Sequence, residues 1–318
     1  MTNAVVFGDS MAFGVMTDST GAPLVPDYLV PWAYTVAYQR NYAVHMLAQS
    51  ATPVGQQAGN IYGYTSVSPD RHFSMPGRAD AEIYGASTGA VALFNHAVGA
   101  MTYWLSGANT KALGAGWTTT GTWTTTPVLG LGIYTGTDGA TIQIPFTGPT
   151  LAFGYLIQDG NYSSFTVSVD GGPSIGPIPC SGEITIGVGS FPNYQPALFR
   201  ASGLGAGAHI ATITAICPSS PNLGSNHVLI DWAMTGGSNG LPLYIVSQPL
   251  STVVAPATVS AYNAVLYSII TNAAADGLNV VLVDSGPKFT SVDLSGDGIH
   301  QSQRGHWRIA YDVLAAGG

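Results

Sequence analysis

The sequence predicts an α/β domain whose chain is interrupted by an antiparallel β-sandwich. Short, nearly continuous apolar runs lie near both ends, and helical periodicity separates two of them. The middle of the chain instead shows alternating apolar residues punctuated by Thr, Gly and Pro. The first pattern is typical of strands buried on both faces of a parallel sheet, the last of half-buried sandwich strands. We expect the α/β domain to comprise residues 1–111 and 235–318, and a jelly-roll-like insert to span 112–234.

The α/β part contains three candidate buried strands, at residues 4–7, 242–246 and 279–283. Between the last two, apolar residues recur at spacings of three and four from Tyr262 to Ala273, which is one face of a helix. A strand, a helix and a second strand in this order form a βαβ unit, whose crossover is right-handed.

The insert contains four candidate strands marked by alternation, at residues 142–146, 165–169, 184–188 and, less regularly, 210–216. Asp170-Gly171-Gly172 is a turn signal after the second of them. The Thr-rich segment 117–126 is typical of an edge strand.

The composition excludes several classes of protein. Only 8 % of the 318 residues are charged, against about 25 % on average, which excludes a charged disordered chain or a coiled coil. The net charge of -8 leaves no basic patch for nucleic acid. No apolar run is long enough to span a membrane, and no basic leader precedes the first strand, so we expect neither a membrane span nor a cleavable secretion signal. Many uncharged polar residues suit a glycan partner.

No cofactor is expected. The histidines other than His300 and His306 show no metal-ligand spacing. The Gly-rich segment 203–207 lacks the lysine of a phosphate loop. Cys180 and Cys217 are either one disulfide or two buried thiols, and the sequence does not decide between them.

A candidate nucleophile, Ser10, follows the first predicted strand within Gly8-Asp9-Ser10. A serine at the carboxyl end of a strand exposes its hydroxyl where open α/β sheets bind ligands, and its own N–H can face a developing oxyanion. The alternative is a simple helix cap.

A candidate acid–base pair, Asp297 and His300, lies near the C-terminus. If the loop turns between them, the carboxylate accepts the imidazole Nδ1–H and leaves Nε2 as a base for a serine. The alternatives are a surface turn, or His306 as the base in place of His300.

Together, VVFGDSMAFG and DGIHQSQRGHWRIA resemble the first and last motif blocks of the SGNH (GDSL) hydrolase family. The resemblance implies a flavodoxin-like α/β/α sandwich with a parallel sheet. It also implies a serine esterase with Ser10 as nucleophile, His300 as general base and Asp297 as its orienting partner. Members of the family are esterases, lipases, thioesterases and carbohydrate deacetylases.

The family's oxyanion donors match this sequence less well. VALFNHAVGAMT resembles the second block, which would make Gly99 a backbone donor alongside Ser10, with Gly89 as the rival glycine. The third block, Gly-x-Asn-Asp, is not intact. Asn239 is the candidate for its side-chain donor, and Asn109 is the alternative.

Some carbohydrate esterases of this family carry a β-sandwich at the place of the insert. By analogy and composition, we expect an enzyme that hydrolyses O-acetyl esters of a polysaccharide through an acyl-enzyme. Aromatic residues of the insert such as Trp117 and Tyr155 either stack on sugars or fill its core. The uncharged, Gly- and Thr-rich chain also resembles phage-tail proteins. From this resemblance we expect a virion component outside the cell, and otherwise a cytoplasmic protein. A lipase or thioesterase, or a non-catalytic glycan-binding or virion structural protein, are the alternatives.

Overall fold

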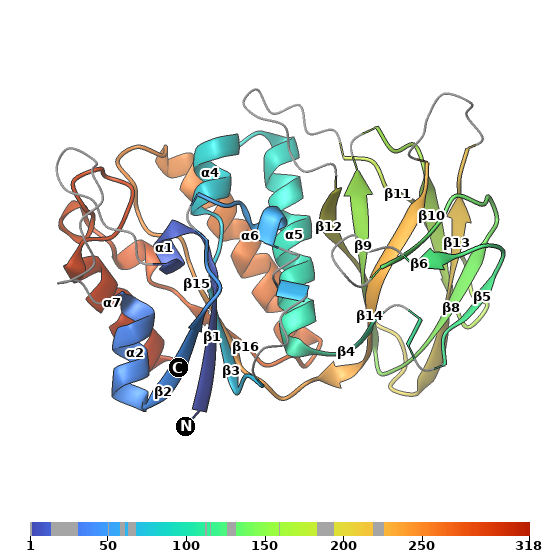
Figure 1. Ribbon diagram of the computed structural model, residues 1–318, viewed down its shortest axis with the longest axis horizontal. Coiled ribbons are helices and arrows are strands. Elements are labelled where there is room, and N and C mark those ends of the chain that lie inside the picture. The colour runs from blue at the N-terminus through green and yellow to red at the C-terminus, as the bar shows by residue number, and fades with distance from the viewer. Residues whose placement is uncertain are drawn as a thin grey trace.

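The computed structural model describes residues 2–13, 31–49, 51–57, 61–62, 68–111, 113–114, 116–125, 132–158, 160–182, 194–218 and 226–318. These residues form a mixed α/β protein in which a helix-covered parallel sheet lies beside two antiparallel sheets (Figure 1).

The parallel sheet has five strands in the spatial order β2-β1-β3-β15-β16. They are β1 (Thr2–Gly8), β2 (Tyr42–Met46), β3 (Arg71–Met75), β15 (Leu243–Val246) and β16 (Val280–Val283). The three apolar runs that the sequence marks as strands form β1, β15 and β16. In chain order this sheet reads 2-1-3-4-5, so the winding reverses between β1 and β3. Ligands of open α/β sheets bind at such a switch point, beyond the carboxyl ends of the strands.

Helices cover both faces of this sheet: α5 (Thr88–Ser106) and α6 (Pro256–Ala275) on one, α2 (Trp32–Arg40) and α7 (Gln303–Ala315) on the other (Figure 1). The alternation of side chains along β1 explains why both faces are apolar. Val5 and Phe7 join the core with α5 and α6, whereas Ala4 and Val6 join the core with α2 and α7. Short segments complete this part, namely α1 (Ser10–Phe13), α4 (Arg78–Tyr84) and the 3-10 turns η2 (Val54–Gln57), η4 (Gly286–Lys288) and η5 (Ser291–Asp293).

Helix α6 carries the predicted apolar stripe on its buried face, including Tyr262, Leu266 and Ala273. Pro256 stands in its first turn, where a missing N–H leaves no hydrogen bond unmade. Gly277, one residue beyond the C-cap, has φ +79°, the left-handed conformation that ends many helices.

The two antiparallel sheets pack face to face as a β-sandwich. Their spatial orders are β11-β10-β13-β8-β5 and β12-β9-β14-β7-β6, with β4 added on β14. The strands are β4 (Gly107–Lys111), β5 (Thr118–Thr120), β6 (Thr124–Thr125), β7 (Ile133–Thr135), β8 (Thr141–Thr147), β9 (Thr150–Gln158), β10 (Ser164–Val169), β11 (Ile175–Pro179), β12 (Tyr194–Ser202), β13 (Ala208–Ile216) and β14 (Val228–Ser238). Ile142 and Phe165 of the first sheet meet Phe153 and Ile230 of the second in one buried cluster.

The sequence patterns of the insert correspond to these strands. Residues 142–146, 165–169 and 210–216 fall in β8, β10 and β13, whereas 184–188 lie outside the described residues. Asp170 and Gly171 have φ of +52° and +72° in the turn between β10 and β11. The Thr-rich segment supplies β5 and β6, which stand at the edges of the two sheets. Cys180 and Cys217 are both free and buried in the core of the sandwich.

The boundary between the parallel-sheet part and the sandwich is not sharp. β4 precedes the expected boundary at residue 111 and yet pairs with β14, which itself continues past residue 235. α5 packs against α6 on one side and against β12 of the sandwich on another. The expected domain boundaries therefore stay predictions, and one sandwich sheet takes in residues on both sides of each.

Within the described ranges, no helix combines the length and the apolar character that crossing a bilayer would require.

Candidate active site at the edge of the parallel sheet

Ser10 is placed by a sharp turn at the end of β1. Gly8 has φ +139°, and a Cβ there would lie 2.6 Å from the Ala12 Cβ and 2.7 Å from the Met75 carbonyl oxygen. Only glycine fits this turn. The chain therefore leaves the strand abruptly, and Ser10 begins α1 beyond the carboxyl edge of the sheet.

Asp9 links this turn by hydrogen bonds to the segment that follows β3. Its Oδ1 accepts the Met11 N–H at 2.9 Å, and its Oδ2 accepts the Ala79 N–H at 2.9 Å. Burial raises the pKa of this carboxyl, although both hydrogen bonds and Arg78 oppose the rise. Asp9 thus joins the end of β1 to the start of α4.

The structure brings Ser10, His300 and Asp297 together. His300 Nε2 lies 2.9 Å from Ser10 Oγ, and His300 Nδ1 lies 2.6 Å from Asp297 Oδ2. With the proton on Nδ1, the imidazole donates to the carboxylate and accepts the serine hydroxyl proton at Nε2. A hydroxyl in this position is set up for nucleophilic attack on a carbonyl.

The second oxygen of Asp297 is held by its own loop. Oδ1 accepts hydrogen bonds from Ser295 Oγ at 2.8 Å, from Ile299 N at 2.9 Å and from His300 N at 3.0 Å. Gly298, with φ +70°, allows the chain to turn between Asp297 and His300. The short spacing of the two residues is therefore closed by a tight turn, which fixes the direction of the imidazole.

Arg78 connects this loop to the rest of the site. Its side chain is 1 % exposed, and Nη2 donates to the carbonyls of Pro249 at 2.6 Å and Leu250 at 3.4 Å. In the same segment, Ser251 Oγ and Thr252 N donate to the Gly298 carbonyl at 3.0 and 2.9 Å. A buried guanidinium thus fixes the segment that holds the Asp297–His300 turn.

The charge of Arg78 is balanced by the acids around it. Burial lowers the pKa of the guanidinium, while Glu82, Asp9 and Asp297 raise it. Among the described residues, no group accepts a hydrogen bond from Arg78 Nε or Nη1.

His306, the alternative base, is fully buried in α7. Burial, and the nearby His300, lower its pKa to about 3. A neutral His306 accepts the Trp32 N–H at Nδ1 over 3.4 Å, and it joins α7 to the start of α2. It packs the fold and does not face Ser10 as a base.

The predicted oxyanion glycine is wrong. Gly99 lies in the middle of α5, where its N–H belongs to the helix and its Cα faces Leu198 and Ile269. The rival Gly89 is in the first turn of the same helix. The segment that resembles the second block is therefore helix rather than a strand end, and it offers no free amide to Ser10.

The predicted side-chain donor is also misplaced. Asn239 precedes β15, at the opposite edge of the sheet from Ser10, and donates to the Leu105 carbonyl at 2.9 Å. The alternative, Asn109, lies in β4 and donates to the Tyr103, Trp104 and Gly107 carbonyls. Both amides satisfy backbone carbonyls at the junction with the sandwich.

Two residues that the sequence reasoning missed occupy the corresponding strand ends. Gly77 follows β3, and Gln248 follows β15. Gln248 is 2 % exposed, its Nε2 donates to the Pro76 carbonyl, and it lies 3.6 Å from the place of a Cβ on Gly77. Because Gly8 pairs with Met75, these residues lie beyond the same edge as Ser10. Polarity directly after the predicted strand 242–246 was the available signal for Gln248.

Among the described residues, no three His, Cys, Asp or Glu side chains come together as metal ligands.

No family model matches the sequence, and no curated protein matches it. The fold is similar to several solved structures. A lipase, Lip_vut3, from a goat rumen metagenome is 8 % identical, with a TM-score of 0.46, over 100 % of this chain and 98 % of that one. The Clostridium thermocellum family 3 carbohydrate esterase is 13 % identical, with a TM-score of 0.43, over 99 % and 94 %.

A family two carbohydrate esterase from Clostridium thermocellum, in complex with cellohexaose, is 18 % identical with a TM-score of 0.27. The match spans 42 % of this chain and only 34 % of that one. With every one of these TM-scores below 0.5, we draw neither fold detail nor chemistry from the likenesses, and the distances between the side chains remain the basis for assigning a function.

Proposed function

We propose that this protein is a serine esterase that removes acyl groups, O-acetyl groups in particular, from a carbohydrate. The observation that carries the proposal is the pair of contacts that join Ser10 Oγ to His300 Nε2 at 2.9 Å and His300 Nδ1 to Asp297 Oδ2 at 2.6 Å. Ser10 and His300 are 290 positions apart in the sequence, so folding must bring the two ends of the chain together to make the contact.

In the first step, Ser10 Oγ attacks the ester carbonyl carbon while its proton moves to His300 Nε2. Asp297 stabilises the resulting imidazolium and holds the Nδ1–H tautomer. Collapse of the tetrahedral intermediate breaks the bond to the sugar oxygen, which takes the proton from Nε2 and leaves as a free hydroxyl. Ser10 then carries the acyl group.

In the second step, water attacks the acyl-serine. His300 Nε2 accepts a proton from the water, and Ser10 Oγ leaves with that proton when the acid is released. The balance is one water consumed and one carboxylic acid formed, with no redox change.

The oxyanion of both intermediates would be held by the Ser10 and Gly77 amides and by Gln248 Nε2. Gln248 has a second N–H beyond the one that it donates to the Pro76 carbonyl. Its backbone is fixed on both sides, since Gln248 N donates to Asn263 Oδ1 at 2.7 Å and Asn263 Nδ2 donates to the Gln248 carbonyl at 2.9 Å. Gln248→Ala should lower kcat by roughly 100-fold, in the range for a single oxyanion donor. An unchanged kcat would remove Gln248 from the oxyanion site.

The proposal includes membership of the SGNH type. It is supported by the strand order 2-1-3-4-5, which is the flavodoxin-like order, and by the position of Ser10 at the switch point. Gln248, which follows β15, would then take the place of the asparagine of the third block.

A carbohydrate substrate is supported by the low charge of the chain, of which 8 % is Asp, Glu, Lys or Arg. An uncharged surface rich in hydroxyl and amide groups matches a neutral, hydroxyl-rich polymer better than an acidic one.

The test measures hydrolysis of p-nitrophenyl acetate, butyrate and octanoate by the parent chain, by Ser10→Ala and by Ser68→Ala. Ser68 is an exposed serine outside the site and serves as the control. We expect acetate to be the best substrate, Ser10→Ala to be inactive and Ser68→Ala to match the parent. Activity that survives Ser10→Ala would overturn the mechanism, and a preference for octanoate would assign the protein to the lipases or thioesterases instead.

A further inference from the structure

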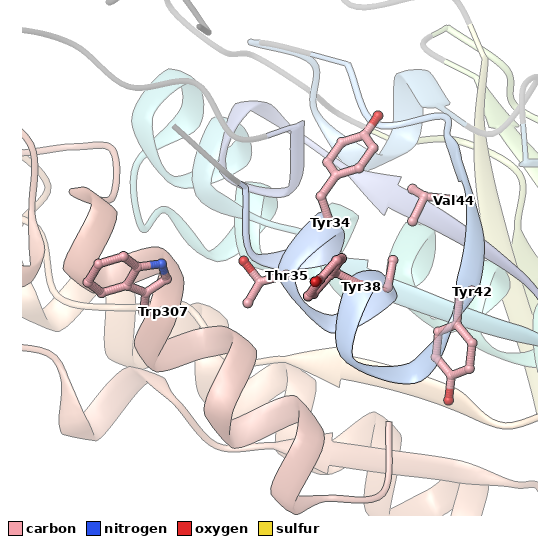
Figure 2. Close-up of a pocket in the computed structure, with 7 residues that line it drawn as sticks. Tyr34, Thr35, Tyr38, Tyr42, Val44 and Trp307 are labelled. Carbon is pink, nitrogen blue, oxygen red and sulfur yellow. The ribbon is translucent and has the colours of Figure 1, made fainter. Parts of the chain in front are cut away.

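A groove with exposed aromatic rings lies on the outer face formed by α2, β2 and α7. Figure 2 shows Tyr34 and Tyr38 projecting from α2, Trp307 from α7, and Tyr42 and Val44 from β2. The hollow has a volume of about 690 Å³ and is also lined by Thr35 and Ala37.

Three of the four aromatic rings of this groove are largely exposed, whereas Tyr42 packs against the core between the sheet, α2 and α7. Tyr34 is 45 %, Tyr38 86 % and Trp307 59 % exposed. The core-facing side of α2 consists of Trp32, Ala33, Val36 and Ala37, of which Ala37 also borders the groove. Large aromatic side chains gathered in a surface hollow without packing indicate a binding site.

The spacing of the rings suits an extended ligand with repeating units. Tyr34 and Tyr38 are four residues apart on one helix, so their side chains stand about one turn, roughly 5.4 Å, apart along the axis. Trp307 faces the same hollow from the neighbouring helix. Tyr42 is not a free platform, because the Arg71 guanidinium lies 4.3 Å from the centre of its ring.

The lining identifies the class of ligand. Among the described residues that line it, none is charged, and their polar side-chain groups are the hydroxyls of Tyr34, Thr35, Tyr38 and Tyr42 and the indole N–H of Trp307. A net charge of -8 on the whole chain disfavours an anionic polymer. The aliphatic part is limited to Ala37 and Val44, too little for an acyl chain. Sugar rings combine apolar C–H faces, which pack on aromatic rings, with hydroxyl rims.

One end of the groove lies toward the candidate active site. α7 begins three residues after His300, and its His306 contacts the backbone N–H of Trp32 at the start of α2. Tyr34 lies in the first turn of α2 and Trp307 in the second turn of α7. The other end of the groove reaches Tyr42, which pairs with Thr2 at the amino end of β1, so a polymer lying along the groove would approach Ser10 from the Tyr34–Trp307 end.

We propose that the Tyr34–Tyr38–Trp307 groove binds a neutral polysaccharide chain and presents its esters to Ser10. The proposal rests on the proposed esterase function and deepens it, since it adds a polymer-binding subsite on the hydrolase part of the chain. A small ester does not reach the groove, so the groove acts on polymer substrates alone.

The test compares Trp307→Ala and Tyr38→Ala with Tyr311→Ala. Tyr311 is 72 % exposed and lies one turn further along α7 but outside the groove, so it is a matched control. Each protein is run in native gels containing xylan, glucomannan or polygalacturonate, and is assayed on p-nitrophenyl acetate and on the acetylated forms of xylan and glucomannan. We expect at least one neutral polysaccharide to retard the parent and Tyr311→Ala. Trp307→Ala and Tyr38→Ala should show about a tenfold higher Kd for it and a similar loss of kcat/KM on its acetylated form, with unchanged rates on p-nitrophenyl acetate.

Three outcomes would overturn the groove proposal: no retardation by either neutral polysaccharide, equal retardation of parent and groove variants, or retardation by polygalacturonate alone. A parent dimer that Trp307→Ala converts to a monomer, measured by light scattering, would assign the face to a second copy of the chain and overturn it as well. The two proposals fail separately. Absence of p-nitrophenyl acetate hydrolysis with intact, Trp307-dependent retardation removes the esterase and keeps the groove, and the reverse result keeps the esterase and removes the groove.

Discussion

Two aspartates, Asp297 at the candidate active site and Asp276 at the junction with the sandwich, are each surrounded by hydrogen-bond donors. Asp297 accepts from His300 Nδ1, Ser295 Oγ and two backbone amides. Asp276 accepts from Arg200 Nε at 2.6 Å and Nη2 at 2.7 Å, from Tyr103 Oη at 2.5 Å and from Thr150 Oγ1 at 2.8 Å. The geometry of the two carboxylates is similar, and their consequences differ.

The difference lies in the partners. The partner of Asp297 is an imidazole whose Nε2 lies 2.9 Å from Ser10 Oγ, so in the proposed mechanism the order around Asp297 serves proton transfer. The guanidinium and hydroxyls around Asp276 keep their protons, so the same order only ties α5 and α6 to β9 and β12. Burial opposes the ionisation of Asp276, but the hydrogen bonds from Arg200, Tyr103 and Thr150 outweigh it and hold the pKa of that carboxyl below its usual value. A well-satisfied carboxylate is therefore a functional sign only when its partner can exchange protons.

The largest expected effect separates these two roles directly. Asp297→Asn should reduce kcat on p-nitrophenyl acetate by roughly 10³- to 10⁴-fold, because the amide no longer stabilises the imidazolium or selects the Nδ1–H tautomer. The melting temperature should change little, since an amide oxygen can still accept from the loop amides. A kcat within tenfold of the parent would mean that Asp297 does not orient the base.

At the junction with the sandwich, a substitution should change the stability of the protein rather than its activity. Asp276→Asn leaves the Arg200 charge without its counter-ion and should lower the free energy of unfolding by about 2–4 kcal/mol in urea titrations. The kcat of the folded enzyme should stay unchanged. The contribution of Asp276 is present above its unfolded pKa, near 4, and is lost as the pH falls through its lower folded value, so the difference between parent and variant should shrink below pH 4. Equal stability of the parent and Asp276→Asn at neutral pH would show that the hydrogen bonds around Asp276 do not stabilise the junction.

Arg78 tests whether a buried charge at the active site acts on chemistry or on folding. Arg78→Met keeps the length of the side chain and removes the hydrogen bonds to the Pro249 and Leu250 carbonyls. If Arg78 positions the Asp297–His300 turn, kcat should fall about 10- to 100-fold with KM nearly constant, and Arg78→Lys should restore part of the rate. A loss of stability with full activity in the folded fraction would make Arg78 purely structural.

The smallest effect concerns a buried carboxyl for which the described residues supply no hydrogen-bond donor. Asp231 in β14 is 0 % exposed, burial raises its pKa to about 8, and neither oxygen finds a hydrogen-bond donor in the part of the chain that the structure describes. The folded state therefore holds this proton up to a higher pH than the unfolded chain, and the parent loses stability as the pH rises from about 4 to 8. Asp231→Asn should raise the melting temperature by about 2–4 °C at pH 8 and by nothing near pH 4. A constant difference across this range would exclude titration of Asp231 as the cause.

The sequence predicted those parts of the site that are contiguous in the chain. Ser10 follows a glycine turn after a strand, and Asp297 and His300 are three residues apart, so local pattern and family resemblance suffice to find them. Their catalytic roles, and the location of the protein on a phage tail, stay predictions. The mixed α/β fold with a β-sandwich was also predictable, because buried strands, alternating strands and the stripe of α6 have distinct periods.

The proposed oxyanion residues were not predictable in the same way. Gly77 and Gln248 meet only because β3 and β15 are neighbours, which is a property of the topology. The segment around Gly99 was misread because α5 is apolar on nearly all sides, and such a helix has no clear stripe to distinguish it from a strand. The sequence also did not show which aromatic residues are exposed. Trp117 and Tyr155 of the sandwich are buried, whereas Tyr38 and Trp307 are exposed.

The position of α5 has a consequence for how the chain unfolds. Its side chains belong to the core beneath the parallel sheet, and Leu93 of the same helix belongs to the core of the sandwich. Separating the parallel-sheet part from the sandwich would expose the side of this helix that packs on the sandwich. Heating should therefore melt both parts in one cooperative transition, and excision of the sandwich should destabilise the parallel-sheet part.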